Sequence, residues 1–492
     1  MADLDKLDTI VSLSKARGFI FQSSEIYGGL GAVYDYGPLG VELKRRINEM
    51  WWNAMTRKHD NIVGLDSAIL MHPRVWEASG HVESFNDPMI DDRQSKMRYR
   101  ADTLIEDYIH KLRQNGKEDR AKEVQEKLDT AGTRKGLNED LYEIIQEEEI
   151  RSPDSGAFDW TEVRQFNLMF QTQFGATAKG EDEAVYFRPE TAQGIYVNFQ
   201  NVVNTSRQQV PFGIAQIGKA FRNEVVARQF IFRMREFEQM EMQYFVEPGQ
   251  DEAEYKRWSE ERFNWFLELG IRPEKLRMED HPPDHLAHYA KDAADIEYDF
   301  PFGWKEVEGV HNRTDFDLSR HKEYSGKKLE YFDPQSQKRY IPYVVETSIG
   351  LDRCVLMVLC DAFRKEEVPG EKEGTTEERN VLKLHPKLAP ITCGVFPLLK
   401  KPELQESAQK LMNELAEDFK VQYDEKGSIG KRYRRLDEAG TPYCLTVDFD
   451  SLEDQSVTLR DRDSMEQERI PMEKAGEVIR QKIKEWKPDN NG

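Results

Sequence analysis

The stretch Lys219 to Val246, KAFRNEVVARQFIFRMREFEQMEMQYFV, constrains the fold most. Its two ends, Ala220 to Val226 and Phe230 to Phe245, are rich in aromatic and β-branched residues and flank a short basic link, which predicts the two strands of an antiparallel hairpin. Strand side chains alternate between the two faces of a sheet. One face therefore carries Arg222 and Glu224 on the first strand, and Arg233, Arg235, Phe237, Gln239 and Glu241 on the second.

That face presents cations, then an aromatic ring, then carboxylates. Guanidinium groups suit phosphate oxygens, an aromatic ring stacks on a planar base, and a desolvated carboxylate pairs strongly with an ammonium. The order predicts a ligand with phosphates at one end, a planar base in the middle and an ammonium beyond. For any single Arg/Glu pair, the alternative is an ordinary half-buried strand with mixed charges in water.

The composition predicts a globular protein of two or three domains. Of 492 residues, 38% are hydrophobic and 33% charged, and no apolar run approaches the ~20 residues of a membrane span. The acidic N-terminus has neither a signal core nor a transit-peptide composition, and the four cysteines include no CxxC, so we expect the cytoplasm and no membrane partner. A net charge of −21 argues against general nucleic-acid affinity. Any nucleic-acid partner must therefore meet a local basic patch.

The hairpin stretch resembles motif 2 of the class II aminoacyl-tRNA synthetases, which reads Phe-Arg-x-Glu, a loop, then Arg-x-x-x-Phe. Phe221, Arg222, Glu224, Arg233 and Phe237 fill this pattern. The phrases SEIYGG, YGPLG and RPETAQG narrow the resemblance to the glycyl-tRNA synthetase family. It implies an α+β fold, in which a class II antiparallel sheet flanked by helices is followed by a small α/β anticodon-binding domain.

The resemblance also implies roles for individual residues. The catalytic arginines, which would grip the phosphates, are Arg222, Arg233 and Arg353. The residues expected to bind ATP are Arg222, Asn223, Glu224, Phe232, Arg233, Arg235, Phe237, Glu306, Val307, Gly350 and Arg353. The residues expected to bind glycine are Arg100, Glu190, Gln239, Glu241, Arg313, Glu346 and Ser348.

Residues 343–353, YVVETSIGLDR, match the third class II motif, a strand that leads into an apolar helix. Thr347 stands where many family members have proline, which leaves the local backbone angle open. This strand should pack beside the hairpin. Glu190, Glu241, Glu346 and Ser348 would then line one small acidic pocket, which suits the smallest amino acid.

ATP brings Mg²⁺ with it, and the resemblance makes Glu306 and Glu346 its candidate ligands. A second set has the spacing of metal ligands: His281, Asp284, His285 and His288. Two prolines interrupt that segment and it has no HExxH or Cys partner, so no structural zinc is expected. The sequence GxxxxGK[ST] does not occur, so a P-loop would not hold the ATP.

We divide the chain into a first catalytic part with motif 1 (1–100), a charged helical insertion (101–150), a second catalytic part with motifs 2 and 3 (151–388) and an anticodon-binding domain (389–492). The insertion reads as two charged helical stretches, with solvated faces as the ordinary interpretation. A charged, Gly-containing link precedes the boundary near Leu388, which predicts that the last domain is an independent unit.

Periodicity predicts several elements outside the hairpin. The expected helices are Leu4–Arg17, Leu39–Arg57 and Glu252–Leu269, and a strand after the second helix should end near Pro73. In the last domain the expected strands and helices alternate along the chain, which predicts a small α/β domain with a mostly parallel sheet. Its expected elements are the strands Ile391–Leu399, Val421–Asp424 and Tyr443–Phe449 and the helix Ile429–Glu438.

Four basic residues of the last domain would form the tRNA-binding patch: Lys431, Arg432, Arg434 and Arg435. The alternative is that they form part of a structural ion-pair face.

The activity implied is the ATP-dependent attachment of glycine to tRNA(Gly) through glycyl-adenylate, with release of AMP and pyrophosphate. The enzyme would be a homodimer joined through the motif 1 helix, Leu39–Arg57. Two alternatives remain: another class II synthetase (threonyl, seryl or prolyl), or a non-catalytic synthetase-like nucleic-acid-binding subunit.

Overall fold

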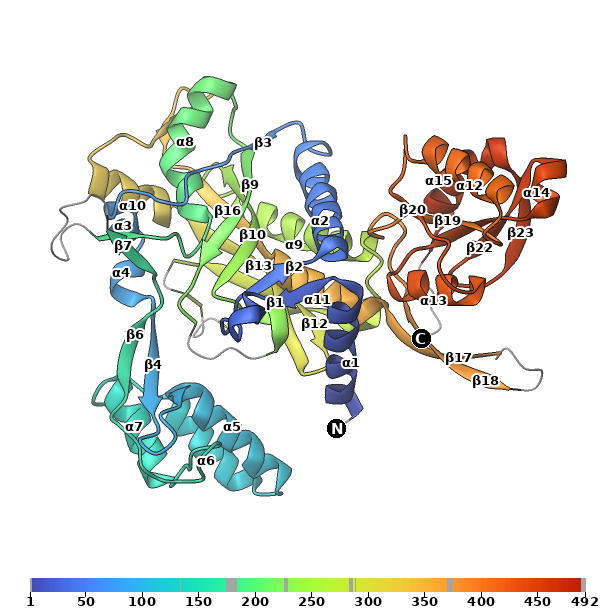
Figure 1. The fold of residues 1–492 in the computed structure, drawn as a ribbon. Coiled ribbons are helices and arrows are strands. Elements are labelled where there is room, and N and C mark those ends of the chain that lie inside the picture. The colour runs from blue at the N-terminus through green and yellow to red at the C-terminus, as the bar shows by residue number, and fades with distance from the viewer. Residues whose placement is uncertain are drawn as a thin grey trace.

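The computed structural model describes residues 2–132, 134–173, 184–224, 229–282, 286–287, 289–369 and 375–487 (Figure 1). Three of the residues weighed as zinc ligands, Asp284, His285 and His288, lie outside these ranges, as does the end of the first predicted hairpin strand.

A seven-stranded sheet forms the centre of the catalytic part (Figure 1), in the order β11-β12-β13-β16-β10-β9-β3. All neighbours are antiparallel except β3, which runs parallel to β9. The strands are β3 (Ile62–Gly64), β9 (Phe212–Phe221), β10 (Glu236–Val246), β11 (Leu276–Asp280), β12 (Asp292–Phe300), β13 (Gly303–Thr314) and β16 (Tyr343–Gly350). The predicted α+β class with an antiparallel sheet is confirmed.

Strands β9 and β10 are antiparallel neighbours, as predicted, but their bounds differ from the prediction. Strand β9 begins earlier and ends before Arg222 and Glu224. The aromatic stretch Phe230–Phe232 forms a 3₁₀ turn, η3, instead of extending β10. The Arg222 amide still donates to the Arg235 carbonyl, with 2.9 Å between N and O. The polar residues of both segments therefore remain side by side just beyond the paired strands.

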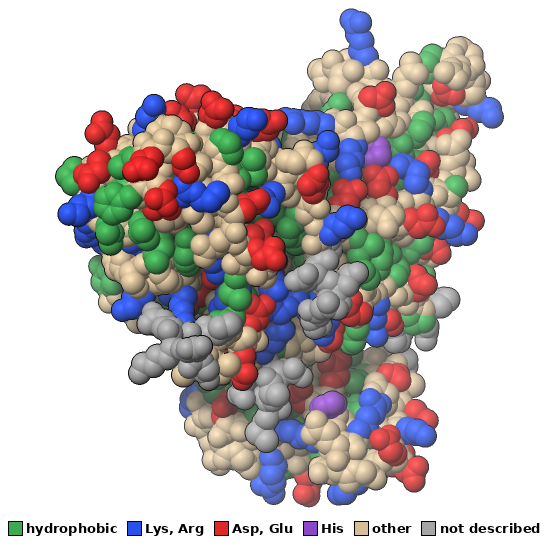
Figure 2. Space-filling model, turned by 90° about the vertical axis from the view of Figure 1, so that its right-hand side faces the viewer, with side chains coloured by type: hydrophobic (Ala, Val, Ile, Leu, Met, Phe, Trp, Pro, Cys, Tyr) green, Lys and Arg blue, Asp and Glu red, His purple; other side chains and the backbone are tan. Residues whose placement is uncertain are grey.

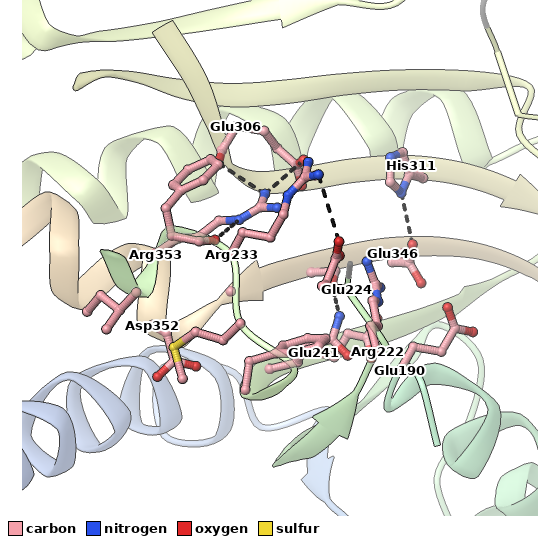
Figure 3. A pocket seen from close by; sticks show the side chains of 18 of the residues that line it. Glu190, Arg222, Glu224, Arg233, Glu241, Glu306, His311, Glu346, Asp352 and Arg353 are labelled. Carbon is pink, nitrogen blue, oxygen red and sulfur yellow. Dashed lines mark hydrogen bonds and ion pairs between the residues drawn. The ribbon is translucent and has the colours of Figure 1, made fainter. Parts of the chain in front are cut away.

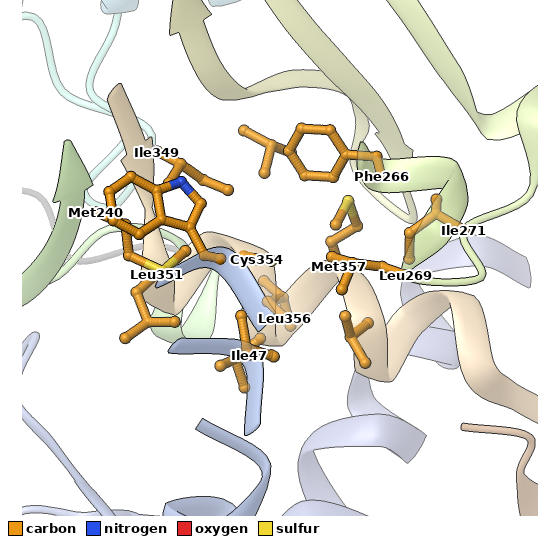
Figure 4. Packing of buried hydrophobic residues seen from close by; sticks show 14 of the residues in the cluster. Ile47, Met240, Phe266, Leu269, Ile271, Ile349, Leu351, Cys354, Leu356 and Met357 are labelled. Carbon is orange, nitrogen blue, oxygen red and sulfur yellow. The ribbon is translucent and has the colours of Figure 1, made fainter. Parts of the chain in front are cut away.

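Four helices pack on one face of the sheet: α1 (Ala2–Arg17), α2 (Pro38–Thr56), α9 (Asp251–Glu268) and α11 (Leu351–Ala362). The predicted helices agree with α1, α2 and α9, whereas the strand expected to end near Pro73 is only the short β3. Figure 4 shows Met240 and Ile349 of the sheet packed with Ile47 of α2 and Met357 of α11. None of the helices in the described part of the chain is long and apolar enough to cross a membrane.

The opposite face of the sheet is apolar at one end and polar at the other. Helices α8 (Ala192–Ser206) and α10 (Phe316–Ser325) cover its apolar end, where Phe199 stacks on Phe212. The polar end stays open as the candidate site. Smaller elements around this face are β1 (Ile20–Gln22), η1 (Glu25–Tyr27), β2 (Tyr34–Tyr36), α3 (Arg74–Ala78), α4 (His81–Ser84), β7 (Gln171–Gln173), β8 (Ala184–Tyr186), η4 (Pro273–Lys275), β14 (Tyr331–Phe332) and β15 (Arg339–Tyr340).

The insertion is a small body with its own core, at the lower left of Figure 1. It contains three helices rather than the two charged stretches expected, because the chain turns between Gln114 and Glu118. Ile105, Val124 and Ile144 from the three helices meet in its core. Its elements are β4 (Asn86–Asp91), β5 (Arg98–Arg100), α5 (Ala101–Gln114), α6 (Glu118–Asp129), α7 (Leu137–Glu147) and β6 (Arg164–Asn167).

The C-terminal domain is a five-stranded sheet with helices on both faces, in the order β20-β19-β21-β22-β23. The prediction of a mostly parallel sheet was wrong: β19 is parallel to β20 and β21, but β22 and β23 are antiparallel. The elements are β19 (Cys393–Pro397), α12 (Pro402–Leu415), β20 (Val421–Tyr423), α13 (Ile429–Glu438), β21 (Tyr443–Val447), α14 (Phe449–Asp454), β22 (Ser456–Asp461), β23 (Gln467–Pro471), η5 (Met472–Lys474) and α15 (Ala475–Glu485).

The link before this domain is a hairpin of β17 (Phe363–Pro369) and β18 (Thr376–Leu382). Arg379 of β18 is only 3% exposed; its Nε donates to Asp437 at 3.0 Å and its Nη2 to the Arg462 carbonyl at 2.6 Å. The link is therefore fastened to the C-terminal domain by buried polar contacts.

Candidate active site

A cavity of about 190 Å³ opens at the polar end of the central sheet, over β10, β13 and β16 (Figure 3). Most of the residues predicted to bind ATP or glycine line it. They are Glu190, Arg222, Glu224, Phe232, Arg233, Phe237, Gln239, Glu241, Glu306, Arg313, Glu346, Ser348, Gly350 and Arg353.

Strand register explains why residues distant in sequence meet here. Glu241 lies opposite Ser348, and Gln239 opposite Gly350, across the β10–β16 pair. On the other side of β16, His311 lies opposite Glu346. Directly opposed residues point to the same face of a sheet. The predicted packing of the third motif beside the hairpin is confirmed.

Glu346 is held by the side chains of Arg313, Gln243 and His311. It accepts hydrogen bonds from Arg313 Nη1 at 3.2 Å and from Gln243 Nε2 at 2.7 Å, and its Oε1 lies 2.9 Å from His311 Nδ1. Burial alone raises the pKa of this carboxyl, but Arg313 and His311 lower the pKa overall. Glu346 is therefore a carboxylate that the protein has already paired.

Glu190 is held in a similar way from another segment. Its Oε2 lies 3.3 Å from His81 Nε2, and its Oε1 accepts a hydrogen bond from Gln193 Nε2 at 2.9 Å. Burial raises the pKa of Glu190, but the charges of His81 and Arg313 outweigh this and lower the pKa well below its usual range. Glu190 is therefore also ionised near neutral pH.

Glu241 differs from the other two because no cation among the described residues contacts it. Thr191 donates a hydrogen bond to its Oε2, and Gln239 and Ser348 lie beside it. Burial, followed by the charges of Glu346 and Glu190, raises the pKa of Glu241 to about 8. The cavity thus contains one carboxyl that an incoming ammonium could ionise.

The other end of the cavity is basic and aromatic (Figure 3). Arg353 Nη1 lies 3.0 Å from Glu306 Oε2, and its guanidinium lies over the Phe232 ring at 4.5 Å. Arg233 approaches Glu224 at 3.8 Å. These partly exposed ion pairs could be exchanged for contacts with phosphate oxygens.

Arg222 lies between the two ends. Its guanidinium lies over the rings of Phe85 and Phe237, 5.3 and 5.2 Å from their centroids, and its Nε donates to the Pro189 carbonyl at 3.1 Å. Within the described part of the chain no second hydrogen-bond acceptor is found for this guanidinium, so its other donors could bind a ligand anion. Phe237 is in position to contact a planar group that displaces or joins this stack.

Four predicted residues do not line the cavity. Val307 is in the core below the sheet, and Asn223 is absent from the lining. Arg235 donates to the carbonyls of Glu224 and Gly31. Arg100 forms ion pairs with Asp87 and Asp102 and lies in a neighbouring hollow that also reaches Arg233 and Phe232. The geometry gives these four residues no direct contact with a ligand in the cavity.

Sequence reasoning missed several residues that shape the site: His81, Tyr289, His311 and Asp352. Tyr289 lies 3.9 Å above the Arg313 guanidinium. Asp352 accepts hydrogen bonds from Tyr36 Oη at 2.5 Å and from the Glu238 amide at 2.8 Å. His81 and its partner Glu190 are remote in sequence, so no local pattern indicated this contact.

The two candidate Mg²⁺ ligands differ in fit. Glu306 has a half-exposed carboxylate, and although burial raises its pKa, Arg353 lowers it overall. Glu346 is buried and already bonded to Arg313 and His311. Among the described residues no group of three or more His, Cys, Asp or Glu side chains could hold a metal ion. Mg²⁺ usually binds through one or two carboxylates together with substrate phosphates, so Glu306 fits and Glu346 does not.

The predicted tRNA patch needs correction. Arg432 is only 3% exposed and donates to the Pro397, Leu398 and Gly427 carbonyls, so it braces loops instead of facing a partner. Arg434 pairs with Glu377, and Arg435 with Asp424. Lys431 is exposed. Arg432 is therefore not part of an exposed patch, whereas binding of tRNA by Lys431, Arg434 and Arg435 stays a prediction.

Comparisons with known proteins agree with this geometry. Residues 172–362 match the family described as tRNA synthetase class II core domain (G, H, P, S and T), and residues 392–482 match the anticodon binding domain. The segments 87–131 and 116–168 match the glycyl-tRNA synthetase insertion domain 1.

Similar curated proteins match over almost the whole chain. The glycine–tRNA ligase of Chlorobaculum tepidum is 58% identical over 97% of this chain and 100% of its own length. That of Treponema denticola is 52% identical over 98% of both chains, and that of Staphylococcus haemolyticus is 49% identical over 97% of this chain and 99% of its own. The chain therefore belongs to the glycyl-tRNA synthetase family of class II aminoacyl-tRNA synthetases.

Proposed function

We propose that this chain attaches glycine to tRNA(Gly). Glycine carboxylate attacks the α-phosphate of ATP, which gives glycyl-adenylate and pyrophosphate. The terminal ribose hydroxyl of the tRNA then takes the glycyl group, and AMP leaves. The observation that carries this proposal is a single cavity that has the buried Glu241 and Glu346 and the half-buried Glu190 at one end and arginines toward the other.

The arginines act on the phosphates. Arg222 binds the α-phosphate and the glycine carboxylate, because its guanidinium lies between the two ends of the cavity. Arg233 and Arg353 bind the γ-phosphate, and Phe237 stacks on adenine beside Glu224. The protein supplies no covalent nucleophile in this reaction. It holds the reacting groups in line and neutralises the charge that develops on phosphate.

The glutamates select the amino acid. Glu241 receives the glycine ammonium, with Glu190, Gln239 and Ser348 beside it. Arg313 and Tyr289 close the space in which a longer side chain would lie. A methyl group there would displace polar contacts to buried carboxylates, which costs free energy through both steric strain and desolvation.

Mg²⁺ would arrive with ATP and be held by Glu306, and when bound it would neutralise phosphate charge.

We propose that the enzyme is a cytoplasmic homodimer. Helix α2 and the edge strand β3 form the candidate interface, since β3 is the last strand of the central sheet. The buried, free thiols of Cys354, Cys360, Cys393 and Cys444 suit a reducing compartment.

Pyrophosphate exchange run separately with glycine, alanine, serine, threonine and proline tests this proposal. Glycine should drive exchange, alanine should do so poorly and serine hardly at all. Equal kcat/KM for glycine and alanine would contradict the role given to the glutamates. Exchange driven by threonine, serine or proline would instead identify a sister synthetase, and no exchange with any amino acid would indicate a non-catalytic relative.

A further inference from the structure

The segment YGPLG, residues 36–40, has no part in the site described above. It joins β2 to α2 and packs closely on the chain that precedes β1. The Gly37 amide donates to the Phe19 carbonyl at 2.9 Å, and a Cβ added at Gly40 would collide with that same oxygen. Only glycine allows this close approach. The backbone at Tyr36 is therefore fixed by its surroundings.

The Tyr36 side chain reaches Asp352 at the start of α11. Its Oη donates to Asp352 Oδ1 at 2.5 Å, and the Glu238 amide donates to Asp352 Oδ2 at 2.8 Å. Each oxygen of this buried carboxylate thus accepts a hydrogen bond. Burial, followed by the charge of Asp352, raises the pKa of Tyr36 well above its ordinary value. The hydroxyl therefore remains a donor across neutral pH.

Helix α2 contacts the same residues from the other side. Lys44 forms an ion pair with Glu238, and its Nζ lies over the Tyr36 ring, 4.9 Å from the centroid. Figure 2 shows Lys and Arg mixed with Asp and Glu over one face of the molecule, and exposed ion pairs contribute little. The side chains of Lys44 and Glu238 are instead only 15% exposed each. Tyr36, Lys44, Glu238 and Asp352 form a closed arrangement, here called the Tyr36 cluster.

The Tyr36 cluster joins the two parts of the cavity that the ends of ATP would contact. Glu238 follows Phe237, the ring that would stack on adenine, and Asp352 precedes Arg353, which would bind the γ-phosphate. Figure 3 shows Asp352 at the same end of the cavity as Arg353. The hydrogen bond from the Glu238 amide to Asp352 connects the start of β10 with the first turn of α11. The Tyr36 hydroxyl holds the carboxylate in the orientation that makes this connection.

We infer that Tyr36 is a positioning residue for ATP. By holding Asp352, it keeps the start of β10 and the first turn of α11 at the separation that one ATP molecule spans. The inference rests on the proposed function, which supplies the assignment of the base and phosphate ends. A frame fixed in advance lowers the conformational-entropy cost of binding a ligand that contacts both ends. A ligand that contacts one end alone gains nothing from the fixed separation.

Tyr36→Phe tests this role, because it removes the hydroxyl and keeps the aromatic ring beside Lys44. Asp352 Oδ1 then lacks its donor while it remains buried, so the carboxylate should reorient. Calorimetry on the full-length chain should show the Kd for ATP rise about tenfold, the loss typical of one hydrogen bond to a charged group. The Kd values for AMP and for inorganic pyrophosphate, each of which contacts one end, should stay within about twofold. The glycine KM in pyrophosphate exchange should not change.

The matched control is Tyr244→Phe on the same strand, β10. Tyr244 is buried and its Oη accepts a hydrogen bond from Asn61 Nδ2 at 2.9 Å, but it is not among the described residues that line the cavity. The control also loses a buried hydrogen bond and should leave the Kd for ATP within about twofold. Three results would overturn the inference: unchanged ATP binding in Tyr36→Phe, an equal loss in the control, or AMP and pyrophosphate weakened by the same factor as ATP.

Asp352→Asn gives a second measure of the same contact. Tyr36→Phe should add little to the loss of ATP binding in that background, because both changes act through one carboxylate. Full additivity would contradict the inference. Calorimetry needs no turnover, so the two proposals can fail separately. If the wild-type chain shows no glycine-dependent exchange, the proposed function fails, while the Kd values for ATP, AMP and pyrophosphate still decide the role of Tyr36.

Discussion

Glycine binding should depend steeply on pH, because Glu241 must lose a proton before it can receive an ammonium. Burial and the charges of Glu346 and Glu190 raise the pKa of Glu241 to about 8 in the empty site, from an ordinary value of 4.5. The competent, ionised fraction is then about one in eleven at pH 7 and about one in a hundred at pH 6. The apparent KM for glycine should therefore rise about tenfold for each unit that pH falls below 8.

The direction of this pH dependence follows from whether Glu241 binds its proton more tightly in the empty site or in the glycine complex. The empty site holds the Glu241 proton up to about pH 8, and the ammonium lowers that pKa, so binding releases a proton between about pH 6 and pH 8. Pyrophosphate exchange at pH 6, 7 and 8 gives KM for glycine and for ATP separately. Calorimetry in buffers of different ionisation enthalpy measures the released proton directly.

Glu241→Gln is the control, because glutamine cannot ionise. Its glycine KM should be high and nearly flat with pH, while its ATP KM should change little. A wild-type glycine KM that changes less than threefold between pH 8 and pH 6, or a variant that keeps the wild-type slope, would refute the reasoning.

Three further outcomes are expected. Arg222→Ala should lower adenylate formation about 10²–10³-fold with the melting temperature unchanged, and exchange near the wild-type rate would contradict its phosphate role. His81→Ala should raise the glycine KM about tenfold and leave the ATP KM alone, yet have no effect in a Glu190→Gln background, because it acts by positioning that carboxylate. A chain that ends at residue 388 lacks Asp437, the ion-pair partner of the buried Arg379, and its free energy of unfolding should fall by about 3–5 kcal/mol. Thermal unfolding near the wild-type temperature would show that the link before the last domain does not need this ion pair.

The resemblance to the class II motifs placed the third motif beside the hairpin, and alternation along β10 and β16 then indicated which residues share a face. Once the third motif was placed beside the hairpin, period-two geometry brought Glu241, Glu346 and Ser348 to one face, and the register agrees. The hairpin tip was not predictable in the same way. Gln229 and Phe230 have positive φ values of 67° and 58°, which turn the aromatic stretch into η3, although its composition favours a strand. Burial of Phe232 against the core decides that conformation, and no local pattern reports it.

Arg432 was wrongly placed in the basic patch for a reason that the sequence did contain in part. Arg432 lies four residues before Leu436, so both share the buried face of α13. The helical period therefore indicates that Arg432 is buried, whereas the number of cations in the segment does not. The ion pairs of Arg434 and Arg435 involve β18 and the loop after β20, and only the fold brings those partners near. Clusters of Lys and Arg become evidence for a polyanion only after paired and buried members are removed.

The same reasoning explains how a site built from three carboxylates can be selective. Glu190 and Glu346 are each held by cations of the protein, whereas Glu241 is held by hydroxyl and amide groups and keeps its proton. One more positive charge in the site would therefore allow all three carboxyl groups to be ionised. A neutral molecule of the same size leaves that deficit in place and gains only weak contacts, while an ammonium removes it. Charge and size are therefore read by the same group of atoms, because the ammonium must come within contact distance of Glu241, in a space that Arg313 and Tyr289 keep small.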